Sequence, residues 1–223
     1  MKTKSNPVRL LFATAVFGAL ASFASAGPGP RHWEALRTEA QFKQLKAGEK
    51  ISYVCNECKT VSEVSVKSPE HSMELCKEGA SLMCPACKTK STVIAKGQRN
   101  DPPTRTEVVY TNAMGEECGF YVKGSAGLQP LTQEAQFHSL KAGDQVAYVC
   151  NVCKTVSDVS IKSHDHAMEL CKVGATVMCP SCKKESKIVA KGKRNDPPTR
   201  TEVIYTNEKG EECGFFAMVP EKK

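Results

Sequence analysis

The sequence predicts a small α+β module that occurs twice in tandem, with mostly short antiparallel strands and two short helices in each copy. All six cysteines of the first half recur 95 positions later, and about two thirds of the paired positions are identical. Short apolar segments alternate with turns, and two segments of the first copy begin with helix-capping residues. Each copy is long enough for only a small core, which a metal ion or disulfides would help to fix.

The first 26 residues are typical of a secretory signal peptide. Met1–Arg9 carries three basic residues and no acidic one, and Leu10–Ala24 is an apolar run. Ala24-Ser25-Ala26 has the small-x-small pattern of a cleavage site. We therefore expect cleavage near Ala26-Gly27, which would make the protein periplasmic or secreted. No later stretch is apolar enough to span a bilayer.

The rest of the chain divides into two copies of one module. We place the first copy at residues 36–123, the second at residues 131–219, and a short flexible linker at residues 124–130. A recent duplication also produces near-identity between copies. Identity between the copies therefore does not by itself mark a residue as functional.

Helices and strands of the first copy can be placed in order. Thr38 and Gln41 form a capping-box pattern, which predicts a short helix that ends by Gly48. Ser68-Pro69-Glu70 supplies a cap, a proline at the first position and an acid in the first turn, so a second helix is expected there. The predicted strands are Ile51–Val54, Val61–Val66, Thr92–Ala95, Thr106–Thr111 and Glu117–Val122.

Each copy carries two Cys-x-x-Cys pairs, and a lysine follows each pair. Two thiolates separated by two residues can grip one metal ion from a tight turn, and two such turns complete a tetrahedral four-sulfur shell. The sequence therefore predicts two zinc ions per chain. The expected ligands are Cys55, Cys58, Cys84 and Cys87 in the first copy and Cys150, Cys153, Cys179 and Cys182 in the second.

The segments Val54–Lys59 (VCNECK) and Met83–Lys88 (MCPACK) resemble the knuckles of zinc-ribbon and rubredoxin-like proteins. The resemblance covers the cysteine turns and their flanking strands, about half of each module. It implies a zinc-ribbon-like module in which backbone N–H groups point at the sulfur atoms. Because 25 residues separate Cys58 from Cys84, the second helix would be an insertion into such a ribbon.

A second ligand set fits the spacing of a ββα zinc finger. Its members are Cys55, Cys58, His71 and Cys76, repeated as Cys150, Cys153, His166 and Cys171. A finger needs apolar core residues where this chain has Ser62 and Ser68, and it would leave three cysteines of each copy unused. The four-cysteine set is favoured, and the finger set remains an alternative.

The two remaining cysteines of each copy are expected to face the core. Cys118 alternates with Phe120 and Val122 along a predicted strand, which places all three on one face. In an oxidising compartment the inward cysteines would form the disulfides Cys76–Cys118 and Cys171–Cys213. Buried free thiols are the alternative to these bridges, and a module with three disulfides is the alternative to both metal sites. Iron also accepts four thiolates, but the oxidising setting favours zinc.

The charge of the chain gives no reason to expect a nucleic-acid partner. The formal charge of +7 falls to +4 when the three basic residues of the signal peptide are removed. Two zinc ions, each bound by four thiolates, would bring this charge to about zero. Export also separates the protein from genomic DNA, so the basic composition does not indicate a nucleic-acid interface.

No catalytic motif is present: the chain has no Gly-x-Ser-x-Gly, no His-Glu-x-x-His and no phosphate loop. A catalytic zinc ion keeps one position open for water, whereas four cysteines close the shell. We therefore expect an exported, non-enzymatic protein that binds an unidentified protein or surface partner through two modules. The alternatives are a protein that buffers or delivers zinc and an exported thiol-redox protein.

Overall fold

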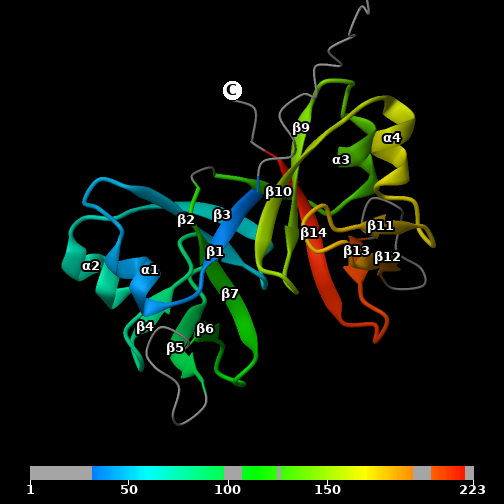
Figure 1. Ribbon diagram of the computed structural model, residues 1–223. Helices are drawn as coiled ribbons and strands as arrows, with labels where there is room; N and C mark the ends of the chain where they lie inside the picture. The colour runs from blue at the N-terminus through cyan, green and yellow to red at the C-terminus, as the bar shows by residue number, and fades with distance from the viewer. Residues whose placement is uncertain (1–31, 98–106, 125–126, 193–201, 219–223) are drawn as a thin grey trace, which may run out of the picture.

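The computed structural model describes residues 32–97, 107–124, 127–192 and 202–218. The predicted signal peptide lies outside these residues. Within them the chain forms fourteen strands and four short helices (Figure 1). In the described part of the chain, no helix combines the length and the apolar character needed to span a bilayer.

The two copies contain the same elements in the same order. The first has β1 (His32–Leu36), α1 (Glu39–Lys43), β2 (Lys50–Cys55), β3 (Thr60–Ser65), α2 (Pro69–Glu74), β4 (Ser81–Met83), β5 (Lys90–Lys96), β6 (Glu107–Thr111) and β7 (Glu117–Val122). The second has β8 (Gln129–Leu131), α3 (Glu134–His138), β9 (Gln145–Cys150), β10 (Thr155–Ser160), α4 (His164–Glu169), β11 (Thr176–Met178), β12 (Glu185–Lys191), β13 (Glu202–Thr206) and β14 (Glu212–Met218).

The predicted α+β class is wrong, because the described chain is mostly β. All fourteen strands of the described residues belong to one continuous sheet, and the strand pairs within it are antiparallel. The helices have only five or six residues each, so they cover parts of the sheet without forming a layer of comparable size. The class was missed because strands of the two copies pair with each other, which no local pattern reveals.

The helices nevertheless begin where the capping residues predict. The Oγ atom of Ser68 accepts the N–H of His71 at 3.2 Å, and Pro69 is the first residue of α2. The side-chain oxygen of Gln41 accepts the N–H of Thr38 at 3.0 Å, which closes the capping box of α1. These contacts satisfy donors that the first turn of a helix leaves unpaired.

Strand β1 joins the two copies. Its residues His32–Glu34 pair with β10 of the second copy, whereas Ala35 and Leu36 pair with β7 of the first. In Figure 1 the strand, drawn in blue, runs between the two halves of the molecule. The residues that lead into the first copy are therefore part of the contact between the copies.

The segment that leads into the second copy pairs with the first copy in the same way. Trp33 pairs with Val156, and Leu128, which is equivalent to Trp33, forms a bridge with Val61. Strand β8 then pairs with β14 of its own copy, as the end of β1 does with β7. Part of the segment predicted to be a flexible linker, residues 124–130, is thus paired with both copies. Each leading strand thus pairs with the other copy as well as with its own copy. This exchange of leading strands has approximate twofold symmetry.

Three apolar cores result from this arrangement. Each copy packs one core beneath its own two helices, with Phe42 and Tyr110 fully buried in the first copy. The third core lies between the copies and contains equivalent side chains from both. Its members include Val54, Val61, Phe120 and Val122 from the first copy and Val149, Val156, Phe215 and Ala217 from the second. Strands β2 and β7 are consequently buried on both faces.

Candidate metal centre

Two turns hold the four cysteines of each copy. In the first copy, Cys55 is the last residue of β2, and Cys58 lies in the turn that leads to β3. Cys84 follows β4, and Cys87 lies in the turn that leads to β5. Both turns connect adjacent antiparallel strands, so the strand pairing holds the two cysteines of each turn close together.

The residue after each cysteine pair adopts a left-handed backbone conformation. The φ angles are 56° at Lys59, 62° at Lys88, 54° at Lys154 and 60° at Lys183. A residue with a Cβ atom seldom occupies this region, and the surrounding structure must favour it. All four turns therefore share one tight geometry that brings the second cysteine back toward the first.

The sulfur atoms have the spacing of ligands around one ion. All four Sγ atoms of each group lie within 4.8 Å of one another. In the first copy, Sγ of Cys55 lies 3.9 Å from that of Cys87, and Sγ of Cys58 lies 3.8 Å from that of Cys84. A tetrahedral ion with Zn–S bonds of about 2.3 Å places its ligands about 3.8 Å apart, whereas bonded disulfide sulfurs lie about 2.05 Å apart. Each group could therefore hold a metal ion.

Hydrogen-bond donors surround the sulfur atoms. The N–H of Cys182 donates to Sγ of Cys179 at 3.5 Å. The hydroxyl groups of Thr60 and Thr155 lie 3.0 Å from the sulfur atoms of the second cysteine in each first turn. Donors of this kind stabilise thiolates, which are the form of cysteine that binds metal. The neighbourhood of the cysteines thus suits an anionic cluster around a cation.

Burial makes the two cysteines of a pair chemically different. Desolvation raises the pKa of the first cysteine in every pair, namely Cys55, Cys84, Cys150 and Cys179. Burial also opposes ionisation of Cys87, but hydrogen bonds from Thr89 and from neighbouring cysteines outweigh it and lower the pKa of Cys87 to about 7. The buried thiols keep their protons at neutral pH, and a bound ion would have to displace them.

The ligand set of a ββα finger is not brought together. Nδ1 of His71 accepts the backbone N–H of Lys67 at 3.1 Å, and the Cys76 thiol donates to the carbonyl oxygen of Met73 at 3.4 Å. Equivalent contacts hold His166 and Cys171 in the second copy. Each of these side chains forms a hydrogen bond with a backbone atom near an end of its own helix, and none belongs to the grouped sulfur atoms.

The expected disulfides Cys76–Cys118 and Cys171–Cys213 do not form, and all twelve cysteines are free. The Cys118 thiol donates to the carbonyl oxygen of Tyr110 at 3.5 Å. The hydroxyl of the same tyrosine donates to the carbonyl oxygen of Leu75, the residue before Cys76, at 2.8 Å. The two thiols therefore lie near opposite ends of one tyrosine side chain, and Tyr205 separates the pair of the second copy in the same way.

Lys59 has a role that the sequence analysis missed. Its Nζ atom lies 2.6 Å from Glu202 and 2.7 Å from Glu212, both in the second copy. The lysine side chain is only 10% exposed. Burial alone would lower the pKa of this lysine, but its hydrogen bonds to the two glutamates outweigh burial and raise it. Lys59 thus stays charged inside the contact between the copies.

Lys154, the equivalent residue of the second copy, makes the reciprocal contacts. Its Nζ atom lies 2.7 Å from Glu107 and 2.8 Å from Glu117, both in the first copy. Lys59 and Lys154 each follow the second cysteine of the first turn. These lysines and glutamates recur at the repeat spacing, but so do most residues of the chain. Identity between the copies was therefore too weak a signal to single them out.

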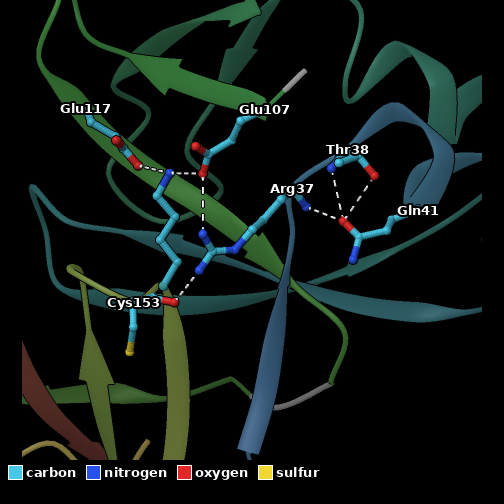
Figure 2. A network of polar contacts seen from close by, with 7 residues as sticks. Arg37, Thr38, Gln41, Glu107, Glu117 and Cys153 are labelled. Atoms are coloured by element: carbon cyan, nitrogen blue, oxygen red, sulfur yellow. Dashed lines mark hydrogen bonds and ion pairs between the residues drawn. The ribbon is translucent and has the colours of Figure 1, made fainter. Parts of the chain in front are cut away.

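Arg37 adds a contact that only one copy has. Its guanidinium group donates to the carbonyl oxygen of Cys153 at 2.5 Å and lies 3.7 Å from Glu107 (Figure 2). Its backbone N–H donates to the side-chain oxygen of Gln41 at 2.7 Å, which fixes the arginine at the start of α1. The second copy has Thr132 at the equivalent position. The cysteine turn of the second copy is thus held by one more residue than that of the first.

No family model matches this chain, and no curated protein or solved structure matches it either. The two four-cysteine groups are compatible with zinc-ribbon-like knuckles, but no family match supports placing the chain among the zinc ribbons. The chemistry of the groups must therefore be argued from the residues themselves.

Proposed function

We propose that the protein is an exported, non-enzymatic interaction protein whose two modules each hold a structural zinc ion. The closed ligand shell is the observation that supports this function, because each group offers four thiols within 4.8 Å of one another. Zinc bound by four thiolates has no position left for water or substrate. Zinc also has no redox chemistry, which favours it over iron in an oxidising compartment.

A structural role agrees with the position of each group in the fold. In the first copy, the ion would join the turn between β2 and β3 to the turn between β4 and β5. These two strand pairs are not direct neighbours in the sheet, because β7 and β6 lie between β2 and β5. An ion shared by their ends would hold the sheet in a curved form and contribute directly to folding.

The two copies would offer the same binding face twice. The helices α1 and α2 lie on one flank of the molecule, and α3 and α4 lie on the opposite flank (Figure 1). Two linked copies of a binding face raise the overall affinity for a repeated target without any new contact. Faces on opposite flanks suit a protein that bridges two partner molecules or two sites on a surface. No nucleic-acid partner is expected.

Zinc buffering or delivery is the second candidate, and the exposure of Cys87 favours it. This cysteine is exposed, and its pKa is lowered to about 7. An accessible ligand can be approached by an incoming chelating group, which is the first step of metal transfer. The equivalent Cys182 is partly buried, so the two sites would differ in how readily they release metal.

Metal analysis of the mature protein, purified from the exported fraction, tests the proposal. We expect an N-terminus at Gly27 and about two zinc ions per chain. The protein is then mixed with isotopically labelled zinc under native conditions. Structural zinc should exchange no faster than the protein unfolds, whereas zinc in transit should exchange within the mixing time. Protein that contains no zinc after purification and binds none in a titration would rule out both candidates.

A further inference from the structure

The first cysteine turn of each four-cysteine group contacts the other copy through the lysine that follows it. Lys59 directly follows Cys58, and its amine enters the contact between the copies to meet Glu202 and Glu212. The amine is buried, whereas the two glutamates are about one third exposed, so solvent screens these ion pairs in part. The position of the lysine depends on the turn, because its backbone must hold a φ of 56°.

One of the two glutamates that contact Lys59 is connected to the first cysteine turn of the second copy. Glu212 precedes Cys213, whose carbonyl oxygen accepts the backbone N–H of Asn151 at 2.9 Å. Asn151 lies between the two cysteines of the first turn in the second copy, directly after Cys150. An unbroken series of contacts therefore joins the first turn of one copy to the first turn of the other.

The same series runs in the opposite direction. Lys154 contacts Glu117, and Glu117 precedes Cys118, whose carbonyl oxygen accepts the N–H of Asn56 at 2.9 Å. The guanidinium group of Arg37 adds a direct contact to the carbonyl oxygen of a cysteine in the second copy. The two turns thus support each other through a closed ring of contacts.

A bound ion would stabilise the turn conformation on which the contacts of this ring depend. An ion held by both cysteines of a first turn fixes the left-handed conformation of the lysine that follows, which a residue with a Cβ atom otherwise avoids. If the turn relaxes when its ion is lost, the lysine can leave its two glutamates. The ring would then let each site influence the arrangement of the other.

We propose that the two four-cysteine sites are coupled, so that filling one site raises the metal affinity of the other. The coupling rests on the proposed function, because it requires both groups to hold metal. It must be reciprocal, since a coupling free energy acts equally in both directions. We expect the first ion to raise the affinity for the second about tenfold, within the range usual for coupled sites.

The chain supplies a matched control in its second turns. Lys88 and Lys183 also follow cysteine pairs and also have left-handed φ angles. The amine of Lys88, however, donates to the carbonyl oxygen of Pro85 in its own turn at 2.8 Å. Replacing Lys88 and Lys183 therefore removes a lysine from the same local geometry without removing the ion pairs of Lys59 and Lys154.

Native mass spectrometry of the mature full-length protein at half-saturation with zinc gives a direct test. If the sites are independent, at least half of the chains carry a single ion at that point, whether or not the two affinities are equal. Tenfold coupling lowers this fraction to about a quarter for sites of equal affinity. We expect the Lys59→Met/Lys154→Met variant to return to half or more and still bind two ions at saturation. The Lys88→Met/Lys183→Met variant should match the wild type.

A wild-type protein whose singly loaded fraction is no lower than that of the Lys59→Met/Lys154→Met variant would overturn the coupling, even if both sites bind zinc tightly. This comparison holds whether or not the two sites have equal affinity. A chain that binds no zinc at all overturns the proposed function instead, so the two failures are distinguishable. If the double variant does not fold, the single variant Lys59→Met takes its place, because reciprocity requires it to weaken the coupling of both sites.

Discussion

The amine of Lys59 and the carboxylate of Glu202 lie 2.6 Å apart, although 143 positions separate them in the chain. The same amine contacts Glu212, so one lysine neutralises two carboxylates of the other copy. The glutamates are about one third exposed, and water partly solvates them. This contact connects a cysteine turn to the interface between the copies, and it has measurable consequences for stability.

The Lys59→Met substitution should lower the free energy of unfolding of the zinc-loaded protein by about 1–2 kcal/mol. It removes charge-assisted hydrogen bonds and leaves two carboxylates near each other, and the partial exposure of the glutamates limits the loss. Urea denaturation at constant pH measures the difference. Lys88→Met is the control and should change stability by less than about 0.5 kcal/mol. Equal losses in the two variants would contradict a special role for the contact between the copies.

Removal of metal should lower the melting temperature of the mature protein by about 10 °C or more. Zinc that binds only the folded state stabilises it in proportion to the logarithm of the ratio of free zinc to the dissociation constant. Thermal unfolding with and without a chelator measures the shift. Cys84→Ser should lose one ion and part of this shift. Cys76→Ser alters a buried cysteine outside the group and should keep both ions, so equal metal contents in these variants would exclude the predicted ligand set.

Zinc affinity should decrease as the pH decreases. Burial raises the pKa of the first cysteine in every pair, so these thiols are protonated at neutral pH, and zinc must displace their protons. Two such protons per site correspond to a change of about 100-fold in apparent affinity per pH unit. Calorimetry in buffers with different ionisation enthalpies counts the protons released. An affinity that stays constant between about pH 6 and 8 would show that other groups bind the metal.

All twelve cysteines should react as free thiols once the protein is denatured in the presence of a chelator. Two disulfides per chain, at the positions expected from the sequence, would leave eight. The reaction is carried out on protein from the compartment in which it accumulates, because the compartment determines whether thiols become oxidised. Eight thiols would show that the tyrosines between the cysteines move aside in the oxidised protein.

Cleavage of the chain between the copies should not separate them. The core between the copies and the exchanged pairing of the leading strands hold them together without a continuous backbone. A protease site inserted between Gly124 and Gly127 allows the cut, and size-exclusion chromatography then measures association. Phe120→Ala should destabilise the protein by about 3–5 kcal/mol and release the halves after cleavage. Phe42→Ala, in the core of one copy, should destabilise to a similar extent while the halves stay together. Separation of the wild-type halves would contradict the shared core.

Local elements were predictable from local chemistry. The strand predicted at Glu117–Val122 has the same bounds in the structure, and Ser68 and Pro69 start α2 as expected. The sheet was not predictable in this way, because the pairing of Trp33 with Val156 joins distant parts of the chain. One signal was present in the sequence: β7 carries no charged residue from Cys118 to Val122, as is typical of a strand buried on both faces.

The cysteine groups could be predicted for a different reason. Spacing within a Cys-x-x-Cys pair determines local geometry, and the repeat shows which pairs belong together. The contacts of Lys59 depend instead on where a second module lies, which the spacing of residues does not encode. The disulfides were predicted wrongly because two inward-facing cysteines can still be separated by the length of a side chain such as Tyr110.

The exchange of leading strands between the copies has the symmetry of a homodimer in which each protomer lends its first strand to the other. Duplication and fusion of a gene for such a protomer would give the present chain. A homodimer must accept every mutation twice, at both symmetric positions, whereas a fused chain can change one position alone. Arg37 and its counterpart Thr132 are such a difference at the interface. In a single chain, one half can therefore make a contact that a symmetric pair would have to make on both sides.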